Sequence, residues 1–288
     1  MRASAPGKII LFGEHAVVYG RHAVVTAINL RCYAEAKKSN SFKIHSPIAT
    51  TGIDYEKHPY VSYAIKRFME IKPIDGAEIK IESEVPIASG LGSSAAVSVA
   101  VLKALDAEFD AGLSNEEIFE LARKVELDVQ GIGSGTDPFV STYGGAWLIP
   151  ERKRIKLEKL KIIVVDSGER SVTAEMVAKV AELRKKLTDV VERVFDVMDA
   201  VSLKALNGDI PKLFKINQCM LKALGVSTRR IDEIVQKLEE MGIAAKLTGA
   251  GGGGSIIGVG SEDALEKARK LFNAIIVEPE QEGARVED

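Results

Sequence analysis

The 288-residue chain is poor in cysteine and histidine and almost balanced in charge. Its two cysteines, Cys32 and Cys219, lie far apart without metal-type spacing, so we expect no disulfide framework and a reducing compartment. The four histidines also lack the spacing of zinc ligands. A formal net charge of −2 gives no reason to expect nucleic acid or an anionic membrane as a partner.

Long apolar runs are absent as well. No stretch approaches the ~20 apolar residues of a transmembrane helix. The first residues reach Pro6 and Gly7 before any long apolar core, unlike a signal peptide. We therefore expect a cytoplasmic protein with no membrane partner, and the length suits about two domains.

Several common nucleotide and hydrolase motifs are missing. The chain has no Gly-x-x-x-x-Gly-Lys-[Ser/Thr] loop, no protein-kinase catalytic motifs and no Gly-x-Ser-x-Gly nucleophile elbow. Gly249, Gly251 and Gly254 match Gly-x-Gly-x-x-Gly, but an apolar strand pattern follows where a dinucleotide site requires a helix. Glycine is nevertheless concentrated in three segments, at 6–20, 86–96 and 246–255.

The second glycine-rich segment has the order strand, loop and helix. Strand-like alternation precedes it at 79–85, and an apolar helical run follows at 97–109. Its glycines allow close backbone approach, and the N-terminus of the helix favours an anion. A structural turn is the alternative, but the paired serines and the long helix favour phosphate binding. The predicted phosphate loop comprises Pro86, Ile87, Ala88, Ser89, Gly90, Leu91, Gly92, Ser93, Ser94, Ala95 and Ala96.

The third segment contains four consecutive glycines between two predicted strands. Such a run costs much backbone entropy, which is explained if a ligand or another backbone lies against the loop. A flexible hairpin without a ligand is the alternative.

Hydrophobic periodicity predicts two parts that meet near 151–159. The first, residues 1–158, should have a strand or hairpin at 2–13, helices at 60–71, 97–109 and from a Ser114–Glu117 capping box onward, a glycine-rich loop at 131–138, and β or mixed structure at 139–149. The second, residues 159–288, should have strands at 161–166, 243–248, 255–259 and 274–277, one long helix at 173–206, and helices at 210–224, 228–241 and 262–272. Apart from the extra helices, this order is β-α-β-β-α-β, the ferredoxin-like arrangement.

The polar residues of these loops could carry phosphoryl transfer. That reaction needs a phosphate cradle, Mg²⁺ ligands, a cation and a residue that orients or deprotonates the acceptor hydroxyl. Ser94 and Glu126 offer oxygen ligands, Lys8 offers a positive charge, and Asp137 lies in a glycine-rich loop. Each alone could be a surface charge or a turn former. Their joint occurrence favours a kinase.

The three glycine-rich segments resemble the signature motifs of the GHMP kinases, a family that includes galactokinase, homoserine kinase, mevalonate kinase and phosphomevalonate kinase. Ala-Pro-Gly-Lys at 5–8 and Gly-Glu-His-Ala-Val-Val-Tyr-Gly at 13–20 resemble the mevalonate kinase branch. Ser-Gly-Thr-Asp at 134–137, Ser-Thr-Tyr-Gly-Gly at 141–145 and Leu-Thr-Gly-Ala-Gly-Gly-Gly-Gly at 247–254 extend the resemblance over nearly the whole chain.

The resemblance implies an α/β (α+β) two-domain fold. Its N-terminal domain would be ribosomal-protein-S5-like and its C-terminal domain ferredoxin-like with extra helices, with ATP between them. The family pattern assigns the loop at 86–96 to the ATP phosphates and assigns Ser94 and Glu126 to Mg²⁺. Asp137 matches the catalytic base and Lys8 its cationic partner. The positions that match the substrate site are Lys8, Glu14, His15, Asp137, Tyr143, Thr173, Gly249, Ala250 and Gly251.

Two positions depart from the family pattern. Ser255 stands where many relatives have cysteine, and the segment at 166–173, which includes Arg170, aligns only loosely with the family.

By the same resemblance, the expected activity is Mg²⁺-dependent transfer of the γ-phosphoryl group of ATP to the 5-hydroxyl of (R)-mevalonate, in isoprenoid biosynthesis. Asp137 would orient the hydroxyl and take its proton while Lys8 keeps Asp137 ionised; alternatively, the two residues only position the reactants. ATP and mevalonate are then the small-molecule partners, and the chain should form a homodimer. A kinase of phosphomevalonate or homoserine, or a non-catalytic sensor on the same fold, are the alternatives.

Overall fold

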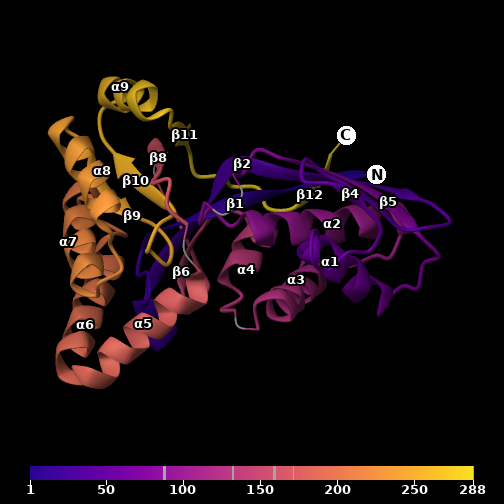
Figure 1. Cartoon of the computed structure of the whole chain (residues 1–288), viewed down its shortest axis with the longest axis horizontal. Helices are drawn as coiled ribbons and strands as arrows, with labels where there is room; N and C mark the ends of the chain where they lie inside the picture. The colour runs from indigo at the N-terminus through magenta and orange to yellow at the C-terminus, as the bar shows by residue number, and fades with distance from the viewer. Residues whose placement is uncertain (87–88, 132, 158–159, 171, 288) are drawn as a thin grey trace.

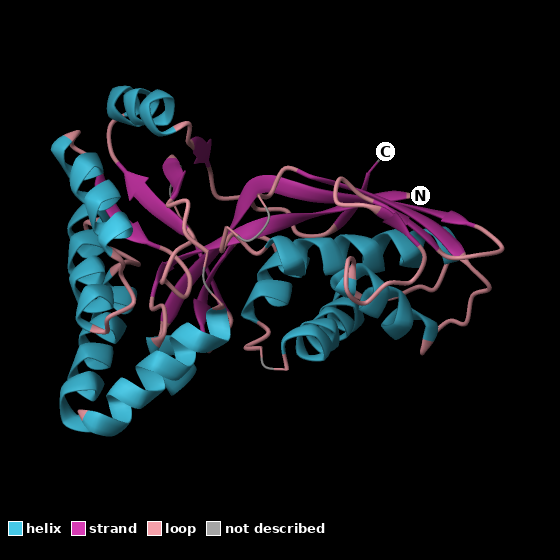
Figure 2. Cartoon of the chain, viewed as in Figure 1, coloured by secondary structure: helices cyan, strands magenta, loops and turns pink. Residues whose placement is uncertain are grey.

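The computed structural model describes residues 1–86, 89–131, 133–157, 160–170 and 172–287. Two sheets lie side by side, and helices cover one face of each (Figures 1 and 2). The larger sheet has the order β12-β1-β2-β5-β3-β4, with β6 and β7 joined to it through β2. Its strands are β1 (Arg2–Phe12), β2 (Ala23–Lys38), β3 (Lys43–His45), β4 (Thr50–Thr51), β5 (Ala77–Ser83), β6 (Ala146–Ile149), β7 (Lys153–Ile155) and β12 (Arg285–Glu287).

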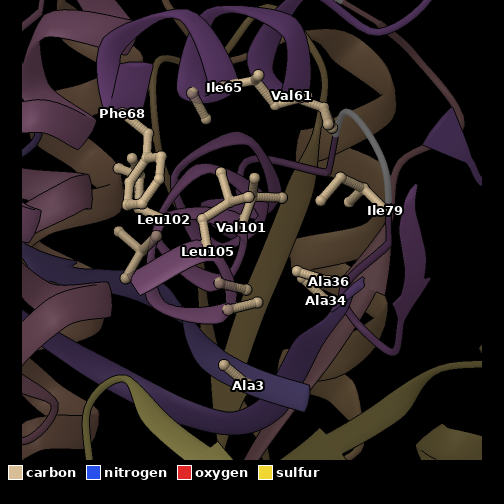
Figure 3. Packing of buried hydrophobic residues seen from close by; sticks show 14 of the residues in the cluster. Ala3, Ala34, Ala36, Val61, Ile65, Phe68, Ile79, Val101, Leu102 and Leu105 are labelled. Carbon is tan, nitrogen blue, oxygen red and sulfur yellow. The ribbon is translucent and has the colours of Figure 1, made fainter. Parts of the chain in front are cut away.

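The helices of the first unit lie beneath this sheet in Figure 2. They are α1 (Pro59–Met69), α2 (Ser93–Phe109), α3 (Asn115–Gln130) and α4 (Thr136–Tyr143). Helix α2 is apolar on most sides because it lies between the sheet and α1. Figure 3 shows Leu102 and Leu105 of α2 among Ile65 and Phe68 of α1 and the small Ala34 of β2. The predicted Ser114–Glu117 capping box is confirmed at the start of α3.

The second unit confirms the predicted ferredoxin-like order. Its strands are β8 (Ile162–Asp166), β9 (Ala244–Leu247), β10 (Ser255–Val259) and β11 (Ile275–Val277). They are arranged β11-β8-β10-β9, and every neighbouring pair is antiparallel. Its helices are α5 (Thr173–Lys186), α6 (Thr188–Lys204), α7 (Ile210–Ala223), α8 (Arg229–Glu240) and α9 (Glu262–Phe272). Within the described residues, no helix is long and apolar enough to cross a membrane.

The prediction of one long helix at 173–206 is wrong. The chain breaks at Leu187, whose φ of −135° and ψ of 53° are not helical, and α5 and α6 run in different directions (Figure 1). Helix α6 buries several apolar side chains, among them Phe195 and Met198, whereas α5 buries only Val180. The apolar spacing continues across the break. The direction of α6 is decided instead by packing of its apolar side chains into the hydrophobic core of the second unit.

The glycine-rich segment before residue 139 also differs from its prediction. Helix α4 begins at Thr136, so Asp137 lies in the first turn of a helix and not in a loop. Gly135, with φ of 71°, precedes the helix, and Pro138 is tolerated because a first turn needs no N–H donor there. The predicted β or mixed structure at 139–149 is therefore helix as far as Tyr143, and only β6 is strand.

The division into residues 1–158 and 159–288 stays a proposal, and residues 158 and 159 lie outside the described part of the chain. One segment departs from it. Strand β12 pairs antiparallel with β1, so the end of the chain returns to the sheet of the first unit, where Figure 1 shows both termini. The last strand of the sequence thus completes the edge of the sheet that contains the first.

Candidate active site

The predicted phosphate loop leads into the N-terminus of α2. Gly90 and Gly92 have φ of 78° and 75°, which favours glycine. Gly92 is the N-cap residue of α2 and has no side chain that could bind the first backbone N–H groups. These groups and the helix dipole form a site for an anion, next to the half-buried Ser93 and Ser94.

The loop is held against β1. The carbonyl of Leu91 accepts a hydrogen bond from the Lys8 backbone N–H at 2.8 Å. The Ser89 hydroxyl donates to the carbonyl of Pro86 at 2.7 Å, and Ala95 and Ala96 are buried in α2. Ile87 and Ala88 of the predicted loop lie outside the described residues.

Lys8 connects this loop with Asp137. Its side chain is only 5% exposed, and its Nζ lies 3.2 Å from the Gly90 carbonyl oxygen and 3.2 Å from Asp137 Oδ2. Gly92 makes room for it, because a Cβ there would come within 2.8 Å of Lys8 Cγ. The cation and the carboxylate predicted for the reaction therefore meet at the edge of the phosphate loop.

Glu126 on α3 is a second carboxylate beside this pair. Its Oε2 accepts a hydrogen bond from the Gly135 backbone N–H at 3.2 Å, just before α4. Burial, and next the negative charge of Asp137, raise the pKa of Glu126 to about 7. The carboxylates of Glu126 and Asp137 thus lie close together, with the ammonium of Lys8 beside them. A divalent cation would reduce the repulsion between the two carboxylates.

The third glycine-rich loop, between β9 and β10, closes over the other two segments. His15 Nε2 lies 2.8 Å from the Ala250 carbonyl oxygen, and the Ser255 hydroxyl donates to the Ser89 carbonyl at 2.7 Å. A Cβ on Gly251 would come within 2.3 Å of the Val226 carbonyl oxygen. The prediction that a ligand or another backbone lies against this loop is confirmed for the backbone. Gly249 faces Gly90: a Cβ added to Gly249 would lie 4.0 Å from the Cα of Gly90.

Three further predicted substrate residues come from different segments of the chain. Glu14 is 1% exposed and directs its carboxylate into the protein interior. The Tyr143 hydroxyl donates to Glu116 at 2.6 Å, at the opposite end of α4 from Asp137. Thr173 is exposed at the first turn of α5. Their contact with a substrate stays a prediction.

Sequence reasoning did not single out Lys246, Asn217 or Thr248, all of which are buried between the two units. A signal was present for Lys246, because it is a charged residue within an otherwise apolar predicted strand. Asn217 lies on α7, and nothing in the sequence around it predicts its partner.

Comparison with known proteins identifies close relatives over the whole chain. Residues 59–145 match the family model for the GHMP kinases N terminal domain, and residues 202–274 match the model for the GHMP kinases C terminal region. The mevalonate kinase of Archaeoglobus fulgidus is 56% identical, with 100% of each chain covered.

Solved structures agree. The Methanococcus jannaschii mevalonate kinase superposes with a TM-score of 0.85 at 31% identity, covering 100% of this chain and 98% of that one. The L. major mevalonate kinase in complex with R-mevalonate gives a TM-score of 0.84 at 25% identity, with 98% and 97% covered.

Proposed function

Because the chain belongs to the GHMP kinase family, we propose that it is a mevalonate kinase, which phosphorylates the 5-hydroxyl of (R)-mevalonate with ATP to give 5-phosphomevalonate for isoprenoid biosynthesis. Full-length similarity to mevalonate kinases supports the choice of acceptor. One observation carries the reaction type: the ammonium of Lys8 contacts both the phosphate loop, at Gly90, and the carboxylate of Asp137.

In the proposed reaction the chain supplies position and charge. The N-terminus of α2 and the backbone at Gly90 and Gly92 hold the ATP phosphates. The acceptor oxygen forms a bond to the γ-phosphorus, the bond between that phosphorus and the bridging oxygen breaks, and ADP leaves. Asp137 orients the 5-hydroxyl and receives its proton, and Lys8 offsets negative charge beside it.

We propose that Ser94 and Glu126 hold Mg²⁺, which would neutralise phosphate charge when bound. Hydroxyl and carboxylate oxygens are the ligands that this cation takes, and the buried Glu126 beside Asp137 would be stabilised by it. Among the residues that the structure describes, no group of three or more His, Cys, Asp and Glu could hold a metal ion. This fits a cation held mainly by phosphate oxygens and water, with few protein ligands.

The acceptor side of the site is assigned to His15 and to the third loop at Gly249, Ala250 and Gly251. Its proximity to the phosphate loop supports this assignment, since Ser255 at the end of the third loop contacts Ser89. A homodimer is also proposed on the family resemblance, and a cytoplasmic location on the low cysteine content. Light scattering after size exclusion tests the dimer.

A coupled ADP-release assay tests the proposed function. Mg²⁺-ATP is supplied with mevalonate, phosphomevalonate, homoserine or galactose in separate reactions. Turnover with mevalonate alone supports the proposal. Turnover with another acceptor alone contradicts the substrate but keeps the phosphate site, and ATP binding without any turnover identifies a sensor.

A further inference from the structure

A buried polar network joins the two units behind the acceptor side of the site. Lys246 on β9 is fully buried, and its Nζ donates hydrogen bonds to Glu14 Oε1 and, at 2.6 Å, to the Leu247 carbonyl. Glu14 Oε2 accepts a further hydrogen bond from Asn217 Nδ2 at 3.0 Å. Both carboxylate oxygens of Glu14 are therefore bound by side chains of the second unit.

This network is an inefficient way to stabilise a fold. Removing an ammonium and a carboxylate from water is energetically costly, and apolar replacements for such pairs are often neutral or stabilising. Burial also lowers the pKa of Lys246, against the opposing effect of Glu14. A role other than stability therefore accounts better for these buried charges.

The segment that Glu14 belongs to is strained. His15 has φ of 62°, an unusual value for a residue with a side chain, and Gly13 has φ of 90°. Gly13 adopts its positive φ at no steric cost, but the conformation of His15 is unfavourable and persists only where its surroundings enforce it. Here the preceding residue, Glu14, is bound by Lys246 and Asn217. The ring of His15 itself contacts the Ala250 carbonyl oxygen at 2.8 Å.

We propose that Lys246 and Asn217 are positioning residues of the acceptor site. By binding the carboxylate of Glu14 they hold His15 in its strained conformation against the third glycine-rich loop, where the hydroxy acid is bound. In this role Glu14 acts through its neighbour His15, from beneath the site. This inference rests on the proposed function for the identity of the acceptor alone.

Three variants test the proposal. Asn217→Ala removes one hydrogen bond to a charged group, and Lys246→Met removes the ammonium but leaves a buried, unpaired carboxylate. Glu14→Gln combined with Lys246→Met removes both charges and should recover the thermal stability that Lys246→Met loses. Lys215→Met is the matched control, because it removes an exposed lysine of α7 that lies 3.7 Å from Glu239.

We expect Asn217→Ala and the double variant to raise the KM for mevalonate by about tenfold or more, because a displaced positioning group weakens alignment of the acceptor. The KM for ATP should stay near the wild-type value, as should both constants in the control. A double variant that recovers thermal stability and the mevalonate KM together would overturn the proposal, since the pair would then act through stability alone.

Hydrogen–deuterium exchange gives a second measurement that needs no activity. The Ala16 and Val17 amides donate to the Glu14 and Gly13 carbonyls at 2.7 and 3.1 Å, so they report on the strained segment. They should exchange faster in Asn217→Ala, while the amides of α2 stay unchanged. If the wild-type protein does not phosphorylate mevalonate, the proposed function fails. Unchanged exchange of the Ala16 and Val17 amides in Asn217→Ala would separately overturn the positioning role.

Discussion

The hydroxyl of Thr248 bonds both backbone groups of Ile10: it accepts from the N–H at 3.2 Å and donates to the carbonyl oxygen at 2.9 Å. One side chain of the second unit thus acts as a strand neighbour for β1 of the first. Ile10 lies two positions after Lys8 in the same strand. The relation therefore fixes the third glycine-rich loop relative to the cation of the site.

Thr248→Val keeps the shape of this side chain but leaves two buried backbone groups of Ile10 without their partner. We expect the free energy of unfolding to fall by about 1–3 kcal/mol, measured in urea. Thr50→Val, at an exposed threonine, should change it by less than about 0.5 kcal/mol. Equal stability of the two variants would show that water replaces the Thr248 hydroxyl.

Asp137→Asn keeps the size of the side chain but removes the proton acceptor and the negative charge beside Lys8. If Asp137 takes the proton, kcat should fall by about 10²–10⁴-fold while the affinity for ATP changes little. Steady-state kinetics and nucleotide titration measure the two quantities. Asp110→Asn, at the exposed end of α2, is the control. Near-normal turnover of Asp137→Asn would remove this residue from the mechanism.

Glu126→Gln should stabilise the protein in metal-free buffer at pH 8. In the folded protein the pKa of Glu126 is about 7, above its usual 4.5. Between these two pH values the folded state retains a proton that the unfolded chain has lost. Wild-type stability should therefore fall between pH 4.5 and 7, by no more than about 3 kcal/mol from this group.

The glutamine has no charge to bury, so its advantage should be clear at pH 8 and small at pH 4.5 in urea unfolding. The same variant should need more Mg²⁺ for activity. A stability difference that does not depend on pH would contradict the burial argument.

His22 links the start of β2 to α6. Burial opposes its charge, but a hydrogen bond and charge attraction with Asp199, followed by Glu151, outweigh burial and raise the pKa of His22. Its stabilising contribution is thus complete below pH 6.5 and is lost as the pH rises through the higher pKa of the folded state. Asp199→Asn should flatten this decline in stability between pH 6 and 9. Thermal unfolding at each pH measures it. A decline as steep as in the wild type would assign it to other groups.

Local sequence determined much of the second unit. Strand 255–259 and helix 262–272 occur as predicted, because a short apolar run predicts a buried strand, helical spacing indicates the buried face of the helix, and Ser261 provides its cap. The phosphate loop could also be predicted from local sequence, since a strand, two glycines and an apolar helix are consecutive in the chain. Local sequence offered Lys8 and Asp137 as charged candidates, and the family motifs added their pairing as catalytic base and cationic partner.

Only the tertiary structure decided the break at Leu187, where packing of α6 overrides continuous apolar spacing, and the helix α4, where a loop and then β or mixed structure were predicted. It also decided what Glu14 binds. Lys246 lies 232 positions further along the chain, and a contact over that separation leaves no periodic trace in either segment. Glycine-rich loops can be recognised by their composition, whereas the buried charges that hold them depend on which strands and helices come together when the chain folds.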